Sequence, residues 1–326
     1  MFLRNTHNMG NRATTINQQI QKLRDRGVVI NDEEKAKENL LDIGYFRLCS
    51  YLFPFEKTYP KLKNRNHEFK AGTQFEDAVT LYYLDFDLRT ILFKYITRIE
   101  VAFRTYVTYT LSNKYIQSPT WFVDPKYIDN SFITKFELDL YNEIRKNPVI
   151  KRHHTNHIND RFAPAWKTLE YMTLGGMETL YKNIKELQDK LTISKYFGVK
   201  QTAVFEQYIE TVRRVRNICA HGGILFDLSL PKGITNGPAG HFSIHHSHKL
   251  TATIQVIEFL LQTVSKNRVK DMQQDIKEAL DRAISKNPKL KSTNIPTSTP
   301  GGKKSEADCD LQTASFLYMY AIRSRI

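Results

Sequence analysis

One segment of this sequence, residues 73–111, constrains the fold more than any other. Its apolar side chains recur every three to four residues, the period of an α-helix with one buried face. The members of this stripe are Leu88, Ile91, Leu92, Tyr95, Ile99, Phe103 and Tyr106. The pattern predicts a long core helix, either unbroken or interrupted near residues 85–87.

The opposite side of this predicted helix is polar and includes Arg89 and Thr97. Glu100 and Arg104 lie there too, four positions apart, where a carboxylate and a guanidinium meet across one helical turn. An ordinary intrahelical ion pair is the simplest interpretation of these two residues.

Helical periodicity also dominates the rest of the chain. Pro54, Pro60 and the polar run 61–70 interrupt it and mark a loop or irregular insert with room for a short hairpin. So does the basic, histidine-rich segment Lys151–Arg161, which its composition predicts to be a loop. The other helical stretches fall within 14–53, 132–144, 175–184, 202–220, 250–264 and 269–284. The predicted fold is therefore mainly α, a helical bundle with additional N-terminal helices and loop insertions.

The expected domain covers residues 14–285, between a flexible N-terminus at 1–13 and a flexible tail at 286–326. The tail lacks apolar periodicity and is rich in Lys, Ser, Thr and Pro. Its last residues, 316–326, are more apolar, and the sequence leaves open whether they form a docking helix.

The cysteines and the hydropathy pattern bear on the cellular compartment. Cys49, Cys219 and Cys309 are odd in number and widely spaced, which argues against a disulfide framework and a zinc knuckle. The N-terminus lacks the apolar core of a signal peptide, and no run of about 18 apolar residues occurs. We expect a soluble, cytoplasmic protein without a membrane partner.

The charge balance points to a polyanionic partner. The chain carries 48 Lys and Arg against 34 Asp and Glu, a formal net charge of +14. Such an excess is typical of nucleic-acid binders, although it also occurs in proteins that resist aggregation or touch anionic membranes.

The strongest chemical signal lies at the end of the predicted helix 202–220. Its apolar flank consists of Phe205, Tyr208, Ile209, Val212, Val215 and Cys219. The other side gathers Arg213, Arg216, Asn217 and His221. Gly222 and Gly223 then allow a left-handed end to the helix. Two arginines, an amide and a histidine at one helix end predict a phosphate site.

These residue types suit RNA cleavage without a metal ion. Histidine takes up and releases protons near neutral pH, so His221 would act as general acid or base. Arg216 would bind phosphate oxygens and stabilise the charged transition state. Asn217 lies four residues before His221 and could orient its ring.

The spacing of Arg216 and His221 implies a second copy of the chain. Five residues correspond to about 140° around a helix, which leaves a wide and incomplete site. A homodimer in which two such helix ends face each other would supply two arginines and two histidines. The alternative is a chance pattern in which the histidine only caps helix carbonyls.

Other candidate sites are weaker. Lys151, Arg152 and Arg161 form a basic stretch that could contact RNA, or could simply be solvated. Two histidine clusters, His153, His154 and His157, and His241, His245, His246 and His248, raise the question of metal binding. No cysteine or acidic residue is spaced to complete a metal site beside either cluster, so we expect no metal and no cofactor. Nucleotide-binding loops and the serine-hydrolase elbow are absent.

Four ordered motifs resemble the abortive-infection bacteriophage-resistance family (Abi_2, the AbiD/AbiF-like group) of the HEPN superfamily. They are Ile43–Leu48 with Tyr51–Phe55; Phe86–Arg89 with Ile99, Glu100 and Arg104; Ala163–Trp166 with Glu170, Leu174 and Gly175; and Arg216 and Asn217 with Cys219–His221. The resemblance extends over residues 14–285. A departure follows His221, where two glycines stand in place of the family's basic or polar residue and aromatic.

The resemblance implies a HEPN-like α-helical fold and a metal-independent endoribonuclease of bacterial defence, or the toxin of a toxin–antitoxin system. It implies catalytic roles for Arg216 and His221, with Asn217 supporting them. Glu100 and Arg104 would be further members of the site. It also implies a homodimer, and for some members a small noncoding RNA as antitoxin.

Two functional hypotheses remain open. The first is this ribonuclease, with Arg213, Lys151, Arg152 and Arg161 as further RNA contacts. The second is a non-catalytic RNA-binding or regulatory module with the same fold. The presence of His221 favours the first, because a binding protein has no evident need of that histidine.

Overall fold

A computed structural model describes residues 12–59 and 63–291 of the chain. The described part is mainly helical, as predicted, and its only β-type pairing consists of isolated bridges. The chain divides into two units, one of residues 1–87 and 278–326 and the other of residues 88–277. A single domain over 14–285 stays a prediction, and the predicted flexible ends fall mostly outside the described residues.

The first unit begins with three short helices whose ends follow capping rules. They are α1 (Ile16–Asp25), α2 (Glu33–Ile43) and α3 (Tyr45–Leu52). Thr15 and Gln18 form a capping box at the start of α1, and Asp32 caps α2. Gly44, with a φ of 87°, lets the chain leave α2 and enter α3 at once.

The insert had room for a short hairpin, and among its described residues one antiparallel bridge joins Glu56 to Phe69. The buried carboxylate of Glu56 holds this insert together, because Arg65 Nε donates to it at 2.9 Å. Nearby, the Tyr51 hydroxyl of α3 donates to Asp85 at 2.8 Å. That bond joins α3 to the first part of α4 (Phe75–Lys114) within this unit.

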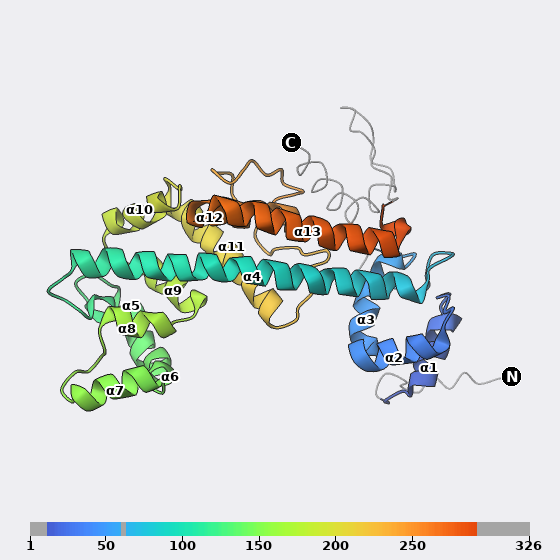
Figure 1. Ribbon diagram of the computed structural model, residues 1–326, viewed down its shortest axis with the longest axis horizontal. Helices are drawn as coiled ribbons and strands as arrows, with labels where there is room; N and C mark the ends of the chain where they lie inside the picture. The colour runs from blue at the N-terminus through green and yellow to red at the C-terminus, as the bar shows by residue number, and fades with distance from the viewer. Residues whose placement is uncertain (1–11, 60–62, 292–326) are drawn as a thin grey trace. The chain divides into compact units, whose positions relative to one another are not determined.

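Helix α4 is continuous from Phe75 to Lys114, so the break considered near residues 85–87 does not occur. Figure 1 shows it as one unbroken rod. No proline or glycine lies between its ends, and the buried stripe runs on without a gap through this stretch. In the second unit it is the helix on which the other elements pack.

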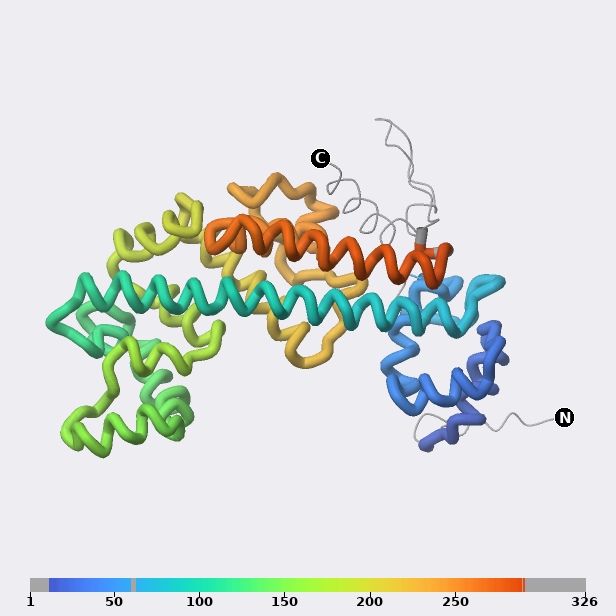
Figure 2. Tube along the Cα trace, viewed as in Figure 1, coloured from blue at the N-terminus to red at the C-terminus, as the bar shows by residue number. Residues whose placement is uncertain are grey.

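The second unit contains the remaining helices. They are α5 (Asn130–Lys135), α6 (Tyr141–Ile144), α7 (Pro148–Asn156), α8 (Ala165–Thr168), α9 (Leu174–Lys182), α10 (Leu187–Tyr196), α11 (Thr202–Ala220), α12 (Leu250–Val264) and the first turns of α13 (Lys266–Lys286). A π-helical turn, Phe136–Leu140, joins α5 to α6. Helix α11 packs against α9, α10 and α12, and Figure 2 traces the chain through them.

Four aromatic rings form the centre of the second unit. Phe103 of α4 meets the rings of Tyr181, Phe197 and Phe205 edge to face, with centroids 5.8–6.2 Å apart. All four side chains are fully buried. Because aromatic pairs prefer this geometry, the cluster fixes α9, α10 and α11 on one stretch of α4.

None of the described helices combines the length and the apolar composition needed to cross a lipid bilayer.

Replacing Phe103 with alanine should lower the free energy of unfolding by about 3–5 kcal/mol, because it leaves a cavity in the aromatic cluster. Urea titration followed by circular dichroism measures this. Tyr109→Ala is the matched control on the same helix, since that ring is 67% exposed, and it should change stability by at most about 0.5 kcal/mol. Equal effects of the two substitutions would contradict the proposed core.

Candidate functional site

The proposed catalytic residues lie at the end of α11, whose bounds agree with the predicted helix. The predicted apolar flank is buried from Phe205 to Val215, and Cys219 is partly covered. The helix ends in a Schellman motif, because the Gly223 amide donates to the Ile218 carbonyl at 2.8 Å. Gly222 takes the left-handed conformation, with a φ of 65°. The predicted glycine stop is confirmed.

The turn after α11 is bound to α4 by Arg89, which the sequence did not indicate as a site residue. Arg89 Nη1 donates to the carbonyl oxygen of Gly223 at 3.0 Å. Arg89 is buried, and it lies eleven residues before Glu100, three turns away on the same side of α4. The spacing of Arg89 and Glu100 is visible in the sequence. The hydrogen-bond partner of Arg89 could not be predicted from it, because that partner is a backbone carbonyl.

A buried carboxylate lies beside Arg216. Glu100 is 8% exposed, and one of its oxygens accepts from Arg104 Nη2 at 3.1 Å. Its other oxygen lies 3.4 Å from Arg216 Nε. The predicted pair of Glu100 and Arg104 is thus formed, and its carboxylate also contacts Arg216 of α11.

The geometry around Arg216 leaves part of its guanidinium available. Its Nε is buried but not aligned for a hydrogen bond to Glu100, so this contact is an ion pair without a directed bond. The guanidinium carbon lies 5.6 Å from the Phe93 ring centroid. Within the described chain, no hydrogen bond engages its terminal nitrogens, and the side chain is 28% exposed. The group is held at its base and open at its tip.

Arg104 has a supporting position instead. Besides Glu100 it binds the Met172 carbonyl at 3.0 Å and lies 3.9 Å from Glu170. It is 9% exposed, so it ties the segment after α8 to α4 and has little surface to offer a ligand.

Asn217 and His221 are exposed, and the described part of the chain shows no hydrogen bond from either side chain. The ring-orienting bond suggested by their spacing is absent. The reason is the helix end: His221 is the C-cap, with φ −102° and ψ 13°, so its side chain no longer follows the helical register. Only its backbone amide reaches Asn217, donating to the carbonyl at 3.0 Å.

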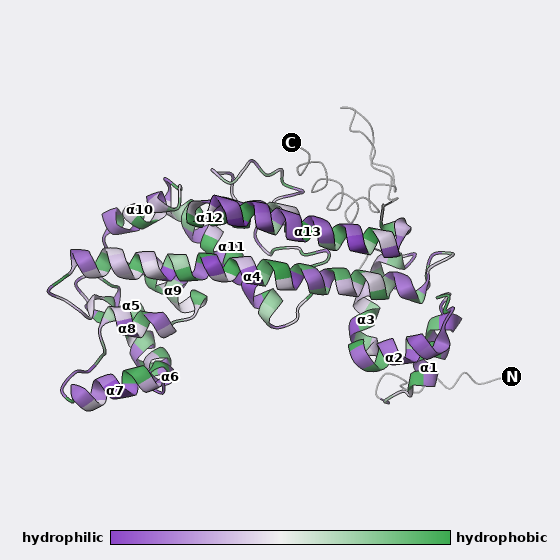
Figure 3. Ribbon diagram, in the orientation of Figure 1, coloured by the Kyte–Doolittle hydropathy of each residue, from purple (hydrophilic) through white to green (hydrophobic). Residues whose placement is uncertain are grey.

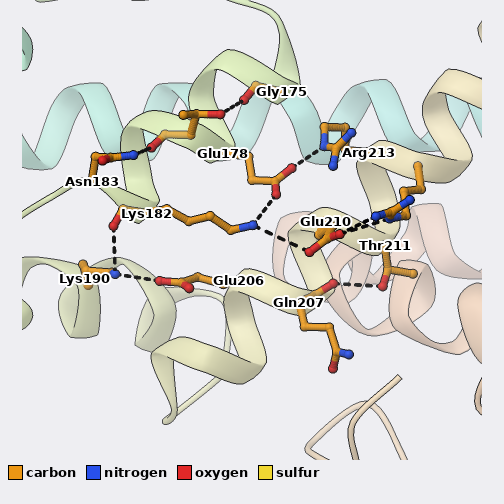
Figure 4. A network of polar contacts seen from close by, with 12 residues as sticks. Gly175, Glu178, Lys182, Asn183, Lys190, Glu206, Gln207, Glu210, Thr211 and Arg213 are labelled. Carbon is orange, nitrogen blue, oxygen red and sulfur yellow. Dashed lines mark hydrogen bonds and ion pairs between the residues drawn. The ribbon is translucent and has the colours of Figure 1, made fainter. Parts of the chain in front are cut away.

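Arg213 belongs to a separate charge network, shown in Figure 4. Its Nε donates to the buried carboxylate of Glu178 in α9, which also accepts from Lys182 at 2.6 Å. Lys182 lies 3.6 Å from Glu210 as well. A methyl group on Gly175 would stand 3.2 Å from the Arg213 side chain, so the glycine makes room for this arginine. Arg213 is therefore held through its Nε by Glu178, while its side chain remains 28% exposed, as that of Arg216 does.

The predicted basic loop is in part a helix, which corrects the sequence interpretation. Lys151 and Arg152 lie on α7, which Asn147 caps by accepting from the Val149 amide, with Pro148 in the first turn. This Asn–Pro start, just before the predicted loop 151–161, is a helix signal. Arg161 follows α7 and pairs with Glu137 at 2.9 Å. In Figure 1, α7 lies well apart from the end of α11 within the same unit.

Histidines of α7 are partly internal. His153 is buried, and burial lowers its pKa, as do the positive charges of Lys167 and His157. Asp160, 3.1 Å from its Nε2, opposes this effect, but that carboxylate is half exposed and screened by water. No group of three or more His, Cys, Asp or Glu side chains in the described residues is arranged to hold a metal ion.

Comparison with known proteins identifies one family. The profile described as Abi-like protein matches residues 38–227, more than half of the chain, including Glu100, Arg104, Arg216 and His221. No curated protein and no solved structure matches the chain.

Substituting Glu100 with glutamine should lower the free energy of unfolding by about 3 kcal/mol, because the buried guanidinium of Arg104 loses its counter-charge. Urea titration measures it. Glu143→Gln removes an exposed carboxylate that pairs with Lys146, and it should change stability by less than about 1 kcal/mol. An unchanged midpoint for Glu100→Gln would show that the carboxylate does not hold this junction.

His153 should make stability fall in mild acid. Its folded-state pKa lies below the unfolded value, so the neutral ring is favoured by folding, and the unfolded chain takes up the proton first as pH falls through about 6.5. Stability is fully present above that pH and declines below it. His153→Gln should flatten the decline in melting temperature between about pH 7.5 and 5.5, whereas His245→Gln, at an exposed position, should not. Parallel curves for wild type and His153→Gln would refute this assignment.

Proposed function

The chain belongs to the Abi-like protein family, and from this premise we propose that it is a metal-independent endoribonuclease. One observation carries the proposal. Arg216 is fixed at its base by Glu100 and Phe93 with its tip open, and the exposed His221 follows it at the end of the same helix. A positioned cation and an available proton carrier at one helix end are the minimum that RNA cleavage by its own 2′-hydroxyl requires.

The proposed reaction uses the RNA's own nucleophile. One histidine takes the proton of the 2′-hydroxyl, whose oxygen attacks the adjacent phosphorus. The bond to the 5′-oxygen breaks, and a second histidine gives that oxygen a proton. The products are a 2′,3′-cyclic phosphate and a 5′-hydroxyl end. Arg216 stabilises the charge that builds on the phosphate oxygens.

Two histidines per reaction imply two chains. Each chain supplies one Arg216 and one His221. Arg216 contacts Glu100 and Phe93 of α4, and no contact with His221 occurs in the described residues. We therefore place the scissile phosphate between two copies of the α11 end in a homodimer. The same architecture makes Glu100 and Arg104 supports of the site, and Asn217 an exposed neighbour of the reacting groups.

The family points to the biological setting. Abortive infection halts the growth of an infected cell, and an RNA-cleaving enzyme can do this by destroying transcripts. Antiphage defence, or a toxin restrained by a small noncoding RNA, is the role we propose. The basic excess of the chain suits both an RNA substrate and an RNA antitoxin.

The test is cleavage of a labelled RNA in EDTA. Wild type should release 2′,3′-cyclic phosphate ends, and Arg216→Ala and His221→Ala should each slow cleavage by about 100-fold or more. Arg214→Ala is the matched control, because that neighbour pairs with Glu210 and should leave the rate nearly unchanged. Expression of wild type, but not of the two inactive variants, should arrest bacterial growth.

Three results would contradict the proposal. They are loss of activity in the chelator, cleavage that survives His221→Ala, and full activity from a species that light scattering shows to be monomeric. RNA binding without any cleavage would instead support the non-catalytic module.

A further inference from the structure

The two tryptophans of this chain have opposite environments. Trp121 is completely buried and its indole donates to Ser112 at 3.1 Å. Trp166 is 55% exposed, and in the described residues it makes no ring contact. Other aromatic rings of the unit are exposed as well, among them Tyr109 and Tyr196, but only the indole of Trp166 offers so large a flat face to a ligand.

The base of Trp166 is rigid. Its neighbour Ala165 is fully buried and donates its amide to the Pro119 carbonyl at 2.8 Å. Thr168, also fully buried, donates its hydroxyl to the Ala163 carbonyl at 2.7 Å. Short helix α8 is thus fastened to the core on both sides of the indole. Trp166 is exposed on a fixed support, so its ordering would cost little on binding.

Helix α7 lies against α8 through the buried hydroxyl of Tyr141. This oxygen accepts from the Ala163 amide at 2.8 Å and lies 2.8 Å from His154 Nε2. The charge of Lys167, next to Trp166, also acts on His153 of α7. The two helices are therefore neighbours in the fold.

The segment that carries both helices is rich in basic residues. Between residues 145 and 167 the chain has six Lys or Arg and one acidic residue, Asp160. The basic residues are Arg145, Lys146, Lys151, Arg152, Arg161 and Lys167, of which Lys146 pairs with Glu143 and Arg161 with Glu137. Lys151 and Arg152 are exposed, with no ion pair in the described chain. In Figure 3, α7 is green at its start next to α6 and purple along its later turns.

We propose that α7 and α8 form an accessory surface that binds single-stranded RNA, distinct from the catalytic end of α11. An unpaired base stacks on Trp166, and Lys151, Arg152 and Lys167 contact the neighbouring phosphates. This inference takes from the proposed function only the assumption that the substrate is RNA. It does not depend on cleavage. Stacking on an exposed indole requires an unstacked base, so the surface selects single strands over duplexes.

A chain of contacts also connects α8 to Arg216. The segment that carries Trp166 continues into Glu170 and Met172, which hold Arg104. Arg104 in turn binds Glu100, the neighbour of Arg216. An RNA strand held by α8 would therefore be anchored to the same frame that fixes the catalytic arginine.

Tryptophan fluorescence tests the proposal with oligothymidylate, which lacks the 2′-hydroxyl and cannot be cleaved by the proposed reaction. Adding it should quench wild-type emission, and Trp166→Phe should abolish the quenching while Trp121 continues to emit. Trp166→Ala should weaken binding of a fluorescein-labelled oligothymidylate by about tenfold. Paired Lys151→Glu and Arg152→Glu should weaken it further and reduce the slope of log affinity against log salt by about 1.4.

The matched control is paired Lys195→Glu and Lys200→Glu, which makes the same charge change at two exposed positions of the same unit. It should weaken binding clearly less than the α7 pair. An absence of quenching, or equal losses in the two charge-reversed proteins, would overturn the proposal. So would a smaller assembly for Trp166→Ala in light scattering, because the surface would then be a protein interface. Since the probe cannot be cleaved, these results are independent of whether the chain cuts RNA.

Discussion

The buried carboxylate of Glu100 is the contact on which the arrangement of the second unit's site depends. It is the only group shown to touch both Arg104 and Arg216 within the described residues, and so it links α4, α11 and the segment after α8. A carboxylate removed from water is costly unless cations surround it. Two arginines meet that need, and one of them, Arg216, has a partly exposed side chain. The charge that stabilises the junction also limits how freely Arg216 can move.

Sequence patterns predicted the helices well, because burial of one face and glycine at the end are local signals for where a helix runs. The stripe on α4, the bounds of α11 and α12, and the glycine stop after His221 all follow from local patterns. The partners of the charged residues could not be predicted in this way. Arg213, predicted as a phosphate contact, pairs with Glu178, thirty-five residues earlier. Such pairs depend on how α9 and α11 pack, which no local pattern encodes.

The net charge of +14 therefore does not indicate where on the protein a polyanion would bind. Arg104, Arg213 and Lys182 all lie against carboxylates, so their charges serve the packing of the helices. The unpaired cations Lys151 and Arg152 lie on α7, where the sequence suggested only a loop. Charge that is already neutralised inside a fold adds little to the field outside it.

The π-helical turn between α5 and α6 sets the angular position of the α6 side chains around the helix axis. A π turn holds one residue more than the α turn it replaces, and each residue rotates a helix by about 100°. Without the extra residue, the ring of Tyr141 would swing by that angle around the axis, away from the Ala163 amide and His154. Single-residue insertions and deletions at 136–140 are therefore not neutral length changes. They are rotations of the tyrosine on which α7 and α8 meet.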